Sequence, residues 1–194
     1  KILPPVLSVQ MVRKTLLLTL GIYILICGVK TVTEGVYFDG GPLFEKRFSI
    51  RNERTKHVYT SHERAGIIND LLAGIKPYIK EDDCLFAYGS IPAINYMTRT
   101  RPFIGCSWPE LLSAPLLKQK LNNYKGPLPA ILRQKFDSIG KEFGTPDENY
   151  LIDCGVEAGT FKSNKKSQVV NEFIEKNNYK IVFENQYFIL FLPQ

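Results

Sequence analysis

The sequence has few of the residues on which metal and disulfide chemistry depend. Its 194 residues include two histidines and four cysteines, and no two cysteines stand at the close CxxC spacing. This excludes a disulfide-dense small scaffold and a standard zinc finger. The two histidines, His57 and His62, are five positions apart and would point to different faces of one helix. We therefore expect no metal site.

Negative charge is missing from the first 33 residues. Glu34 is the first acidic residue, and the basic residues before it are Lys1, Arg13, Lys14 and Lys30. The formal net charge is +6, from 25 Lys and Arg against 19 Asp and Glu. Without those four residues the balance is 21 against 19, a net charge of +2 for residues 31–194. The excess flanks the amino-terminal segment, and the almost balanced remainder disfavours a nucleic-acid partner.

An apolar run without charge lies between Lys14 and Lys30. Extended to about 20 residues by the threonines and valine that follow, it approaches the length that spans a bilayer. We interpret residues 1–34 as a membrane segment with flanks and residues 35–194 as an extracytoplasmic soluble domain, because basic residues at the amino end favour a cytoplasmic start. A signal peptide that starts at Met11 and a buried core helix remain as alternatives.

Local patterns after this segment predict an α/β domain with a mixed sheet, flanking helices and a C-terminal β-hairpin. Thr60, with Glu63 three residues later, predicts the start of a helix that ends at Pro77. The apolar run 84–88 predicts a buried strand, followed by a turn and a helix that begins near Pro92 and is capped by Ser90.

The second half continues in the same manner. We expect helices over 110–124 and 128–143, a buried strand over 150–154, and a helix capped by Ser167. Two β-rich runs, 179–184 and 187–192, are joined by Asn185 and Gln186 and predict the closing hairpin.

Candidate ligand-binding residues follow the predicted strand 84–88. Backbone N–H groups at Tyr88-Gly89-Ser90 could hold an anion, and Arg99 with Arg101 could bind phosphate. Without GxGxxG or GxxxxGK[ST] around this turn, a nucleotide is disfavoured and we expect no cofactor. The bland alternatives are a structural turn and a solvated basic loop.

Other candidates have equally plain structural explanations. Tyr88 and Tyr96 could stack on sugar rings or pack in the core. Asp153 ends its predicted strand, where parallel sheets often bind ligands, or it is a loop residue. Asp82 and Asp83 form a carboxylate pair or a solvated turn. Cys84 and Cys154 are either small buried residues or, on neighbouring strands, a disulfide.

The stretch from Asp83 to Pro102 resembles a pattern in multi-pass membrane glycosyltransferases. These are the dolichyl-phosphate-mannose-protein-mannosyltransferase-like enzymes of the C-type superfamily, in versions from Bacteroidetes-type bacteria. The resemblance lies in the strand 85–88, Gly89-Ser90, Pro92, Tyr96-Met97-Thr98 and Arg101-Pro102. The preceding apolar segment and the closing hairpin fit the same arrangement.

This resemblance implies the C-terminal periplasmic domain of an inner-membrane transferase that takes sugar from a polyprenyl-phosphate donor. The catalytic acid of such enzymes lies in an early loop that this sequence does not contain, so we expect no catalytic residue here. The expected partners are the upstream transmembrane region, the membrane, and a lipid-linked sugar or glycan acceptor. A membrane-anchored, non-enzymatic binding domain is the alternative, and a secreted hydrolase that uses Asp83 or Asp153 is a third.

Overall fold

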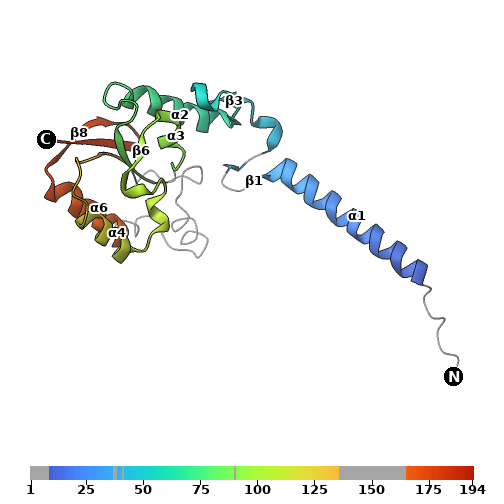
Figure 1. Cartoon of the computed structure of the whole chain (residues 1–194). Coiled ribbons are helices and arrows are strands. Elements are labelled where there is room, and N and C mark those ends of the chain that lie inside the picture. Colours follow the sequence, from blue (N-terminus) through green and yellow to red (C-terminus); the bar gives the residue numbers. More distant parts are fainter. Residues whose placement is uncertain (1–8, 37–38, 41, 90, 136–164) are drawn as a thin grey trace.

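A long apolar helix opens the structure, a computed structural model that describes residues 9–36, 39–40, 42–89, 91–135 and 165–194. This helix, α1 (Val9–Glu34), begins before Arg13 and Lys14, which were expected to flank the apolar run. It projects from the α/β part (Figure 1). The span Gln10–Glu34 has a mean hydropathy of 2.0 and none of its apolar window is buried. The hydroxyls of its threonines donate to backbone oxygens one turn back, which removes polar groups from the helix surface: Thr15, Thr19, Thr31 and Thr33.

The α/β part is built on a five-stranded mixed sheet with strand order β6-β5-β7-β9-β8. The strands are β5 (Cys84–Tyr88), β6 (Arg101–Pro102), β7 (Ala130–Gln134), β8 (Tyr179–Glu184) and β9 (Phe188–Pro193). Strand β5 runs parallel to β6 and β7, whereas β9 is antiparallel to β7 and β8. The mixed α/β class and the C-terminal hairpin are therefore confirmed.

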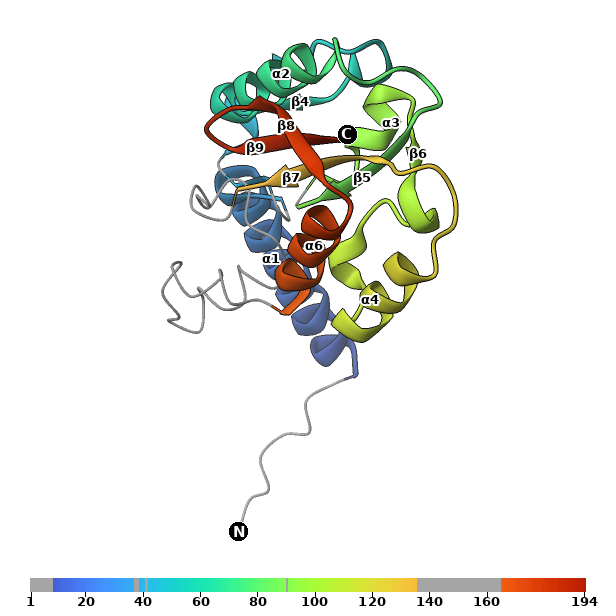
Figure 2. The ribbon, with the colours of Figure 1, turned by 90° about the vertical axis from the view of Figure 1, so that its left-hand side faces the viewer.

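Among the described residues, helices cover both faces of this sheet (Figure 2). They are α2 (His62–Ile75) and α3 (Ile94–Thr98) on one face, and α4 (Ala114–Asn122) and α6 (Lys165–Lys176) on the other. Alternation along β5 supplies both cores. Leu85 and Ala87 pack with α2 and α3, while Phe86 and Tyr88 pack with α4 and α6.

Short elements join α1 to this sheet and follow β6. The first group is β1 (Gly35–Val36), β2 (Asp39–Gly40), η1 (Leu43–Glu45), β3 (Phe48–Ser49), η2 (Glu53–Thr55) and β4 (Tyr59–Thr60). The second is η3 (Phe103–Gly105) and η4 (Pro109–Leu111). Strands β3 and β4 form a small antiparallel hairpin of their own.

The predicted helix over 128–143 is wrong in its described part. Residues 130–134 form β7, which pairs with β5 on one side and β9 on the other. Ile131 and Leu132 are fully buried on opposite faces of the sheet. These residues are compatible with a helix, but they form a strand because the neighbouring strands on both sides supply hydrogen-bond partners for their backbone N–H and C=O groups.

Two helix caps also differ from expectation. Helix α2 is capped by Ser61, whose hydroxyl accepts from Arg64 N, while Thr60 belongs to β4. Ser167 lies inside α6 instead of capping it. Helix α3 starts at Ile94, two residues after Pro92.

Over 110–124 the chain forms η4 and then α4, because the backbone at Leu112 is extended between them. The expected strand over 150–154, with Asp153 and Cys154, lies outside the described residues, as does Ser90.

Candidate functional site

Tyr88 is a core residue. Its side chain is 1% exposed and its hydroxyl lies 3.5 Å from the hydroxyl of Ser167 on α6. A ring with no free face cannot stack on a sugar. Its burial therefore supports the interpretation of Tyr88 as a core residue. Ser167, which lies within α6, contacts its hydroxyl.

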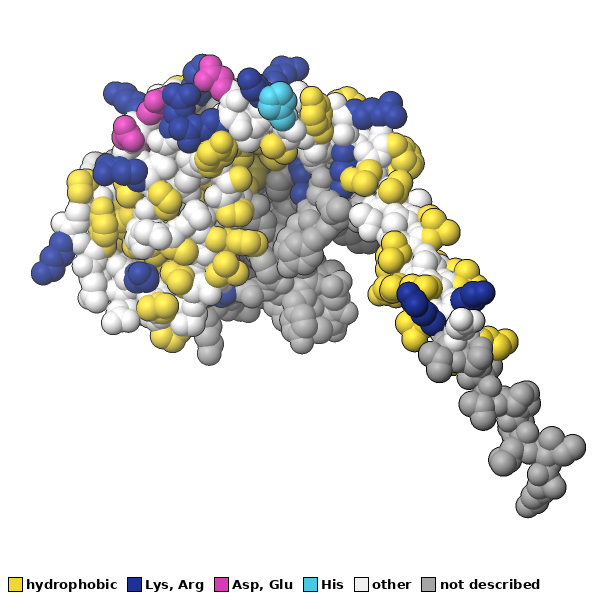
Figure 3. All heavy atoms as spheres, turned by 45° about the vertical axis from the view of Figure 1, so that its right-hand side comes forward, with side chains coloured by type: hydrophobic (Ala, Val, Ile, Leu, Met, Phe, Trp, Pro, Cys, Tyr) yellow, Lys and Arg dark blue, Asp and Glu magenta, His cyan; other side chains and the backbone are white. Residues whose placement is uncertain are grey.

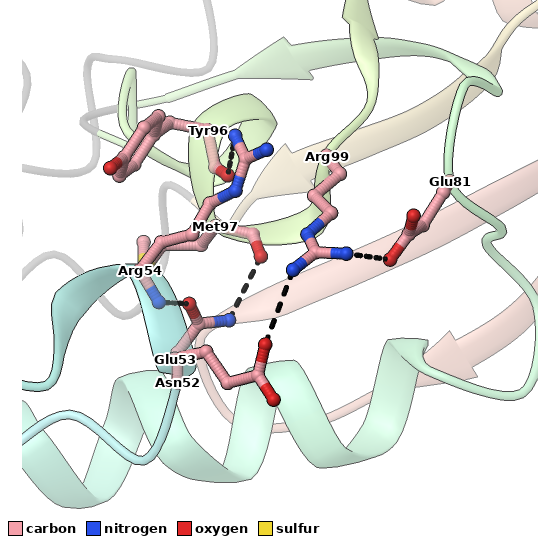
Figure 4. A network of polar contacts seen from close by, with 7 residues as sticks. All are labelled: Asn52, Glu53, Arg54, Glu81, Tyr96, Met97 and Arg99. Atoms are coloured by element: carbon pink, nitrogen blue, oxygen red, sulfur yellow. Dashed lines mark hydrogen bonds and ion pairs between the residues drawn. The ribbon is translucent and has the colours of Figure 1, made fainter.

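Arg99 and Tyr96 belong to a polar network that ties the η2 region to the end of α3 (Figure 4). Arg99 donates to Glu81 at 2.7 Å and to Glu53 at 3.2 Å, so two carboxylates already neutralise its guanidinium. The guanidinium of Arg54 lies 5.0 Å from the centre of the Tyr96 ring and covers one of its faces. A phosphate would have to compete with both glutamates for Arg99.

The backbone in the same region is held by side-chain amides. Asn52 accepts from Arg54 N at 3.0 Å and donates to Met97 O at 2.8 Å (Figure 4). Buried Asn95 donates to Leu85 O and to the hydroxyl of Thr100. These contacts fix the turn that Arg99 closes in a left-handed conformation, with φ of 56°. The network therefore has a structural role.

Arg101, two residues after Arg99, lines a groove of about 880 Å³. The groove lies at the end of the sheet where β5 and β7 begin and β9 ends. Gly89, which follows β5, lies at the opposite end. Its lining combines tyrosines, prolines and aliphatic side chains with charged groups: Tyr78, Asp82, Asp83, Cys84, Arg101, Pro102, Ile104, Gly105, Tyr124, Pro127, Leu128, Ala130, Leu192 and Pro193. Arg99 and Arg101 both lie beside the turn 81–83, but the side chain of Arg99 pairs with glutamates whereas that of Arg101 lines the groove.

The charged rim is positioned by the turn before β5. Asp82 has φ of 65°, and its carbonyl accepts from Arg101 Nε at 2.9 Å. The carboxylate of Asp83 accepts from Lys80 N at 2.7 Å, which closes the turn. Both aspartates are exposed, so they remain hydrated and keep oxygens available to a ligand. This arrangement fits the interpretation of Asp82 and Asp83 as a solvated turn.

Two titratable groups that line the groove, Cys84 and Tyr124, interact with each other and with nearby Tyr179. Burial raises the pKa of the Cys84 thiol, against smaller opposing effects of the Arg101 charge and of a hydrogen bond with Tyr124. Burial also raises the pKa of Tyr124, and the neighbouring thiol adds to that shift. Tyr179, whose pKa burial raises strongly, donates its hydroxyl to Pro129 O at 2.9 Å. All three groups are therefore protonated near neutral pH.

This chemistry suits binding better than covalent catalysis. A protonated thiol is a poor nucleophile, and no histidine lines the groove to activate it. Within the described ranges, no group of three or more His, Cys, Asp or Glu side chains could hold a metal ion. Tyrosine rings beside carboxylates and a guanidinium offer apolar faces and hydrogen bonds together.

The sequence pointed to Cys84 and Arg101 but not to the tyrosines beside them. Tyr78 follows α2, Tyr124 follows α4 and Tyr179 begins β8, so they come from three distant segments. No spacing or motif links these positions. The sheet register pairs Cys84 with Arg101 in neighbouring parallel strands, but this register is known only from the structure.

Comparisons with known proteins leave the family open. No protein-family model, no curated protein and no solved structure matches the chain.

Proposed function

We propose that this chain is the carboxyl-terminal, periplasmic domain of a bacterial inner-membrane glycosyltransferase with a lipid-linked sugar donor, and that its groove binds the glycan acceptor. In this proposal α1 is a membrane span, and catalysis belongs to spans upstream of Lys1. The observation that carries the proposal is α1 itself, an apolar helix of 26 residues with no buried apolar window. Such a surface is stable in lipid but not in water.

The groove supports a role in acceptor binding. A pyranose ring presents C–H groups that pack on tyrosine faces and hydroxyls that bond to carboxylates and guanidinium groups. Tyr78 is 41% exposed at the groove, and Arg101, Asp82 and Asp83 lie around it. The groove therefore offers both kinds of contact that a neutral glycan needs.

The sequence upstream of Lys1 and a transfer assay test this function together. We expect about eight or more further spans and an acidic first loop. In the complete protein, Arg101→Ala should raise the KM for acceptor about tenfold, a loss of about 1.4 kcal/mol in binding, with kcat almost unchanged. Lys120→Ala on α4, which removes a charge away from the groove, is the matched control.

An unchanged KM for Arg101→Ala would refute the role of the groove. An open reading frame that begins at Met11 would refute the transferase itself. The second candidate is a membrane-anchored, non-enzymatic binding domain, which the apolar helix α1 and the groove also support. That candidate predicts glycan binding without sugar transfer.

A further inference from the structure

The segment that follows α1 exposes an unusual share of apolar side chains. Of eleven large hydrophobic residues exposed outside α1 in the described ranges, five lie in the 18 residues from 43 to 60. Each is between 41% and 56% exposed: Leu43, Phe44, Phe48, Val58 and Tyr59. We call residues 43–60 the juxtamembrane surface. Isolated exposed hydrophobics are ordinary, but a dense group next to an apolar helix calls for a partner.

Positive charge is concentrated in the same 18 residues. The juxtamembrane surface has five Lys and Arg against two Glu, a net charge of +3, whereas residues 31–194 as a whole carry +2. The whole excess of the α/β part therefore lies here. Arg47, Arg51 and Lys56 are exposed, and within the described part of the chain no ion pair engages them.

Within the described residues, a glutamate of this surface pairs with a cation outside it. Glu53 is bound to Arg99, so its charge is offset by a residue outside the surface. Arg54 is also occupied, since it covers Tyr96. The three free cations are therefore the ones available to an external anion.

The fold places this surface beside the apolar helix. Element η1 lies against α1, and β3 lies between α1 and α2 (Figure 1). Figure 3 shows hydrophobic and basic side chains gathered where α1 joins the α/β part. Aromatic side chains are enriched at both membrane–water interfaces, and clustered Lys and Arg beside a span attract anionic headgroups.

We propose that the juxtamembrane surface rests on the headgroups of an anionic phospholipid bilayer. Phe44, Phe48 and Tyr59 insert at the headgroup boundary, while Arg47, Arg51 and Lys56 contact lipid phosphates. This proposal rests on the membrane insertion of α1, which is the first element of the proposed function. A protein surface, such as an upstream membrane region, is the competing occupant.

Depth-dependent fluorescence quenching tests the contact in the full chain reconstituted in vesicles. Phe48→Trp is made in a Trp108→Phe background, so that the introduced indole is the only one. Brominated phospholipids should quench it about fivefold more than the indole of Leu116→Trp, a control position on α4 that is 39% exposed. Equal quenching at the two positions would overturn the proposal.

Hydrogen exchange of the otherwise unaltered chain provides an independent readout if the tryptophan variants fold poorly. Amides of residues 43–60 should exchange about tenfold more slowly when phosphatidylglycerol is added to phosphatidylcholine vesicles, and high salt should reverse the effect. The variant Arg47→Glu/Lys56→Glu should lose this protection. The control Lys120→Glu/Lys180→Glu, two exposed lysines on α4 and β8, should keep it.

The possible results distinguish membrane insertion of α1 from lipid contact of residues 43–60. Failure of α1 to insert, seen as release of the chain by alkaline carbonate, would refute the membrane span itself. Insertion without protection of residues 43–60 would refute only the lipid contact. Protection that depends on added upstream protein, and not on lipid charge, would assign the surface to the protein partner and overturn the proposal.

Discussion

Cys84 shows how burial alone can suppress the chemistry of a reactive residue. Its half-buried thiol lines the groove, and the energetic penalty of burial on the charged form outweighs the attraction of Arg101 for a thiolate. The residue is therefore a small groove-lining side chain in the neutral form. Burial also raises the pKa values of Tyr124 and Tyr179, so both hydroxyls stay protonated well above neutral pH and can donate hydrogen bonds.

We predict that Cys84 is alkylated slowly at neutral pH and that its rate rises only above the ordinary pKa of a thiol. The sign follows from burial, which disfavours the thiolate that reacts. Tyr124→Phe removes a hydrogen bond that stabilises the thiolate, so the rate should fall a further threefold or so, about 0.7 kcal/mol. Mass spectrometry of iodoacetamide-treated full chain, with Cys106 as internal reference, measures the rate.

Tyr187→Phe is the matched control for this experiment, because it removes a tyrosine hydroxyl away from the groove lining. A Cys84 rate at pH 7 equal to that of an unstructured cysteine would show that the thiol is not held in the neutral form.

At the scale of elements, the end of β5 packs closely on β7. Gly89 has φ of 142°, and a Cβ atom built there would lie 2.5 Å from Cβ of Gln134. Gln134 is itself 1% exposed and pairs with Phe188 in β9. The turn after β5 therefore needs glycine for its backbone conformation and for the space that a neighbouring strand occupies.

We predict that Gly89→Ala lowers the free energy of unfolding by about 1–3 kcal/mol, from backbone strain and overpacking together. Gly66→Ala in α2 is the matched control, because a Cβ there meets no atom within 4 Å. It should raise stability by about 0.5–1 kcal/mol through helix propensity. Urea unfolding in detergent, followed by Trp108 fluorescence, measures both. Equal stability of the two variants would contradict the close approach.

At the scale of the whole molecule, α1 and the α/β part differ in where their apolar side chains lie. The α/β part buries apolar residues on both faces of its sheet, whereas α1 has them all exposed. At about 1.5 Å per residue, the 25-residue span Gln10–Glu34 is about 37 Å long, enough for a hydrocarbon core of about 30 Å. Lys30 and Glu34 form an ion pair at its end.

We predict that the full chain resists extraction from membranes by alkaline carbonate. Leu20→Arg/Ile24→Arg should release it, since each arginine at the centre of a span costs about 2.5–3.5 kcal/mol on insertion scales. Leu20→Ala/Ile24→Ala, at the same positions, should stay in the membrane. A mature protein that lacks α1 by mass spectrometry would show a cleaved signal sequence instead.

The sequence by itself determined the features that depend on neighbouring residues. These are the apolar helix, the strand 84–88 with its glycine turn, the helix before Asn177, and the closing hairpin. Each is set by local periodicity, by a turn residue or by the absence of charge. The split of the net charge at Glu34 is likewise a property of the chain alone.

Only the tertiary structure decided the features that depend on distant residues. Residues 130–134 became a central strand because β5 and β9 bond to both of their edges, which outweighs local helix propensity. Tyr88 is buried against α6, so its ring is not accessible to a ligand. Arg99 pairs with the carboxylates of Glu53 and Glu81, which come from separate segments. The groove beside Cys84 brings together Tyr78 and Tyr124 from distant segments, and no local pattern predicts that they lie close together.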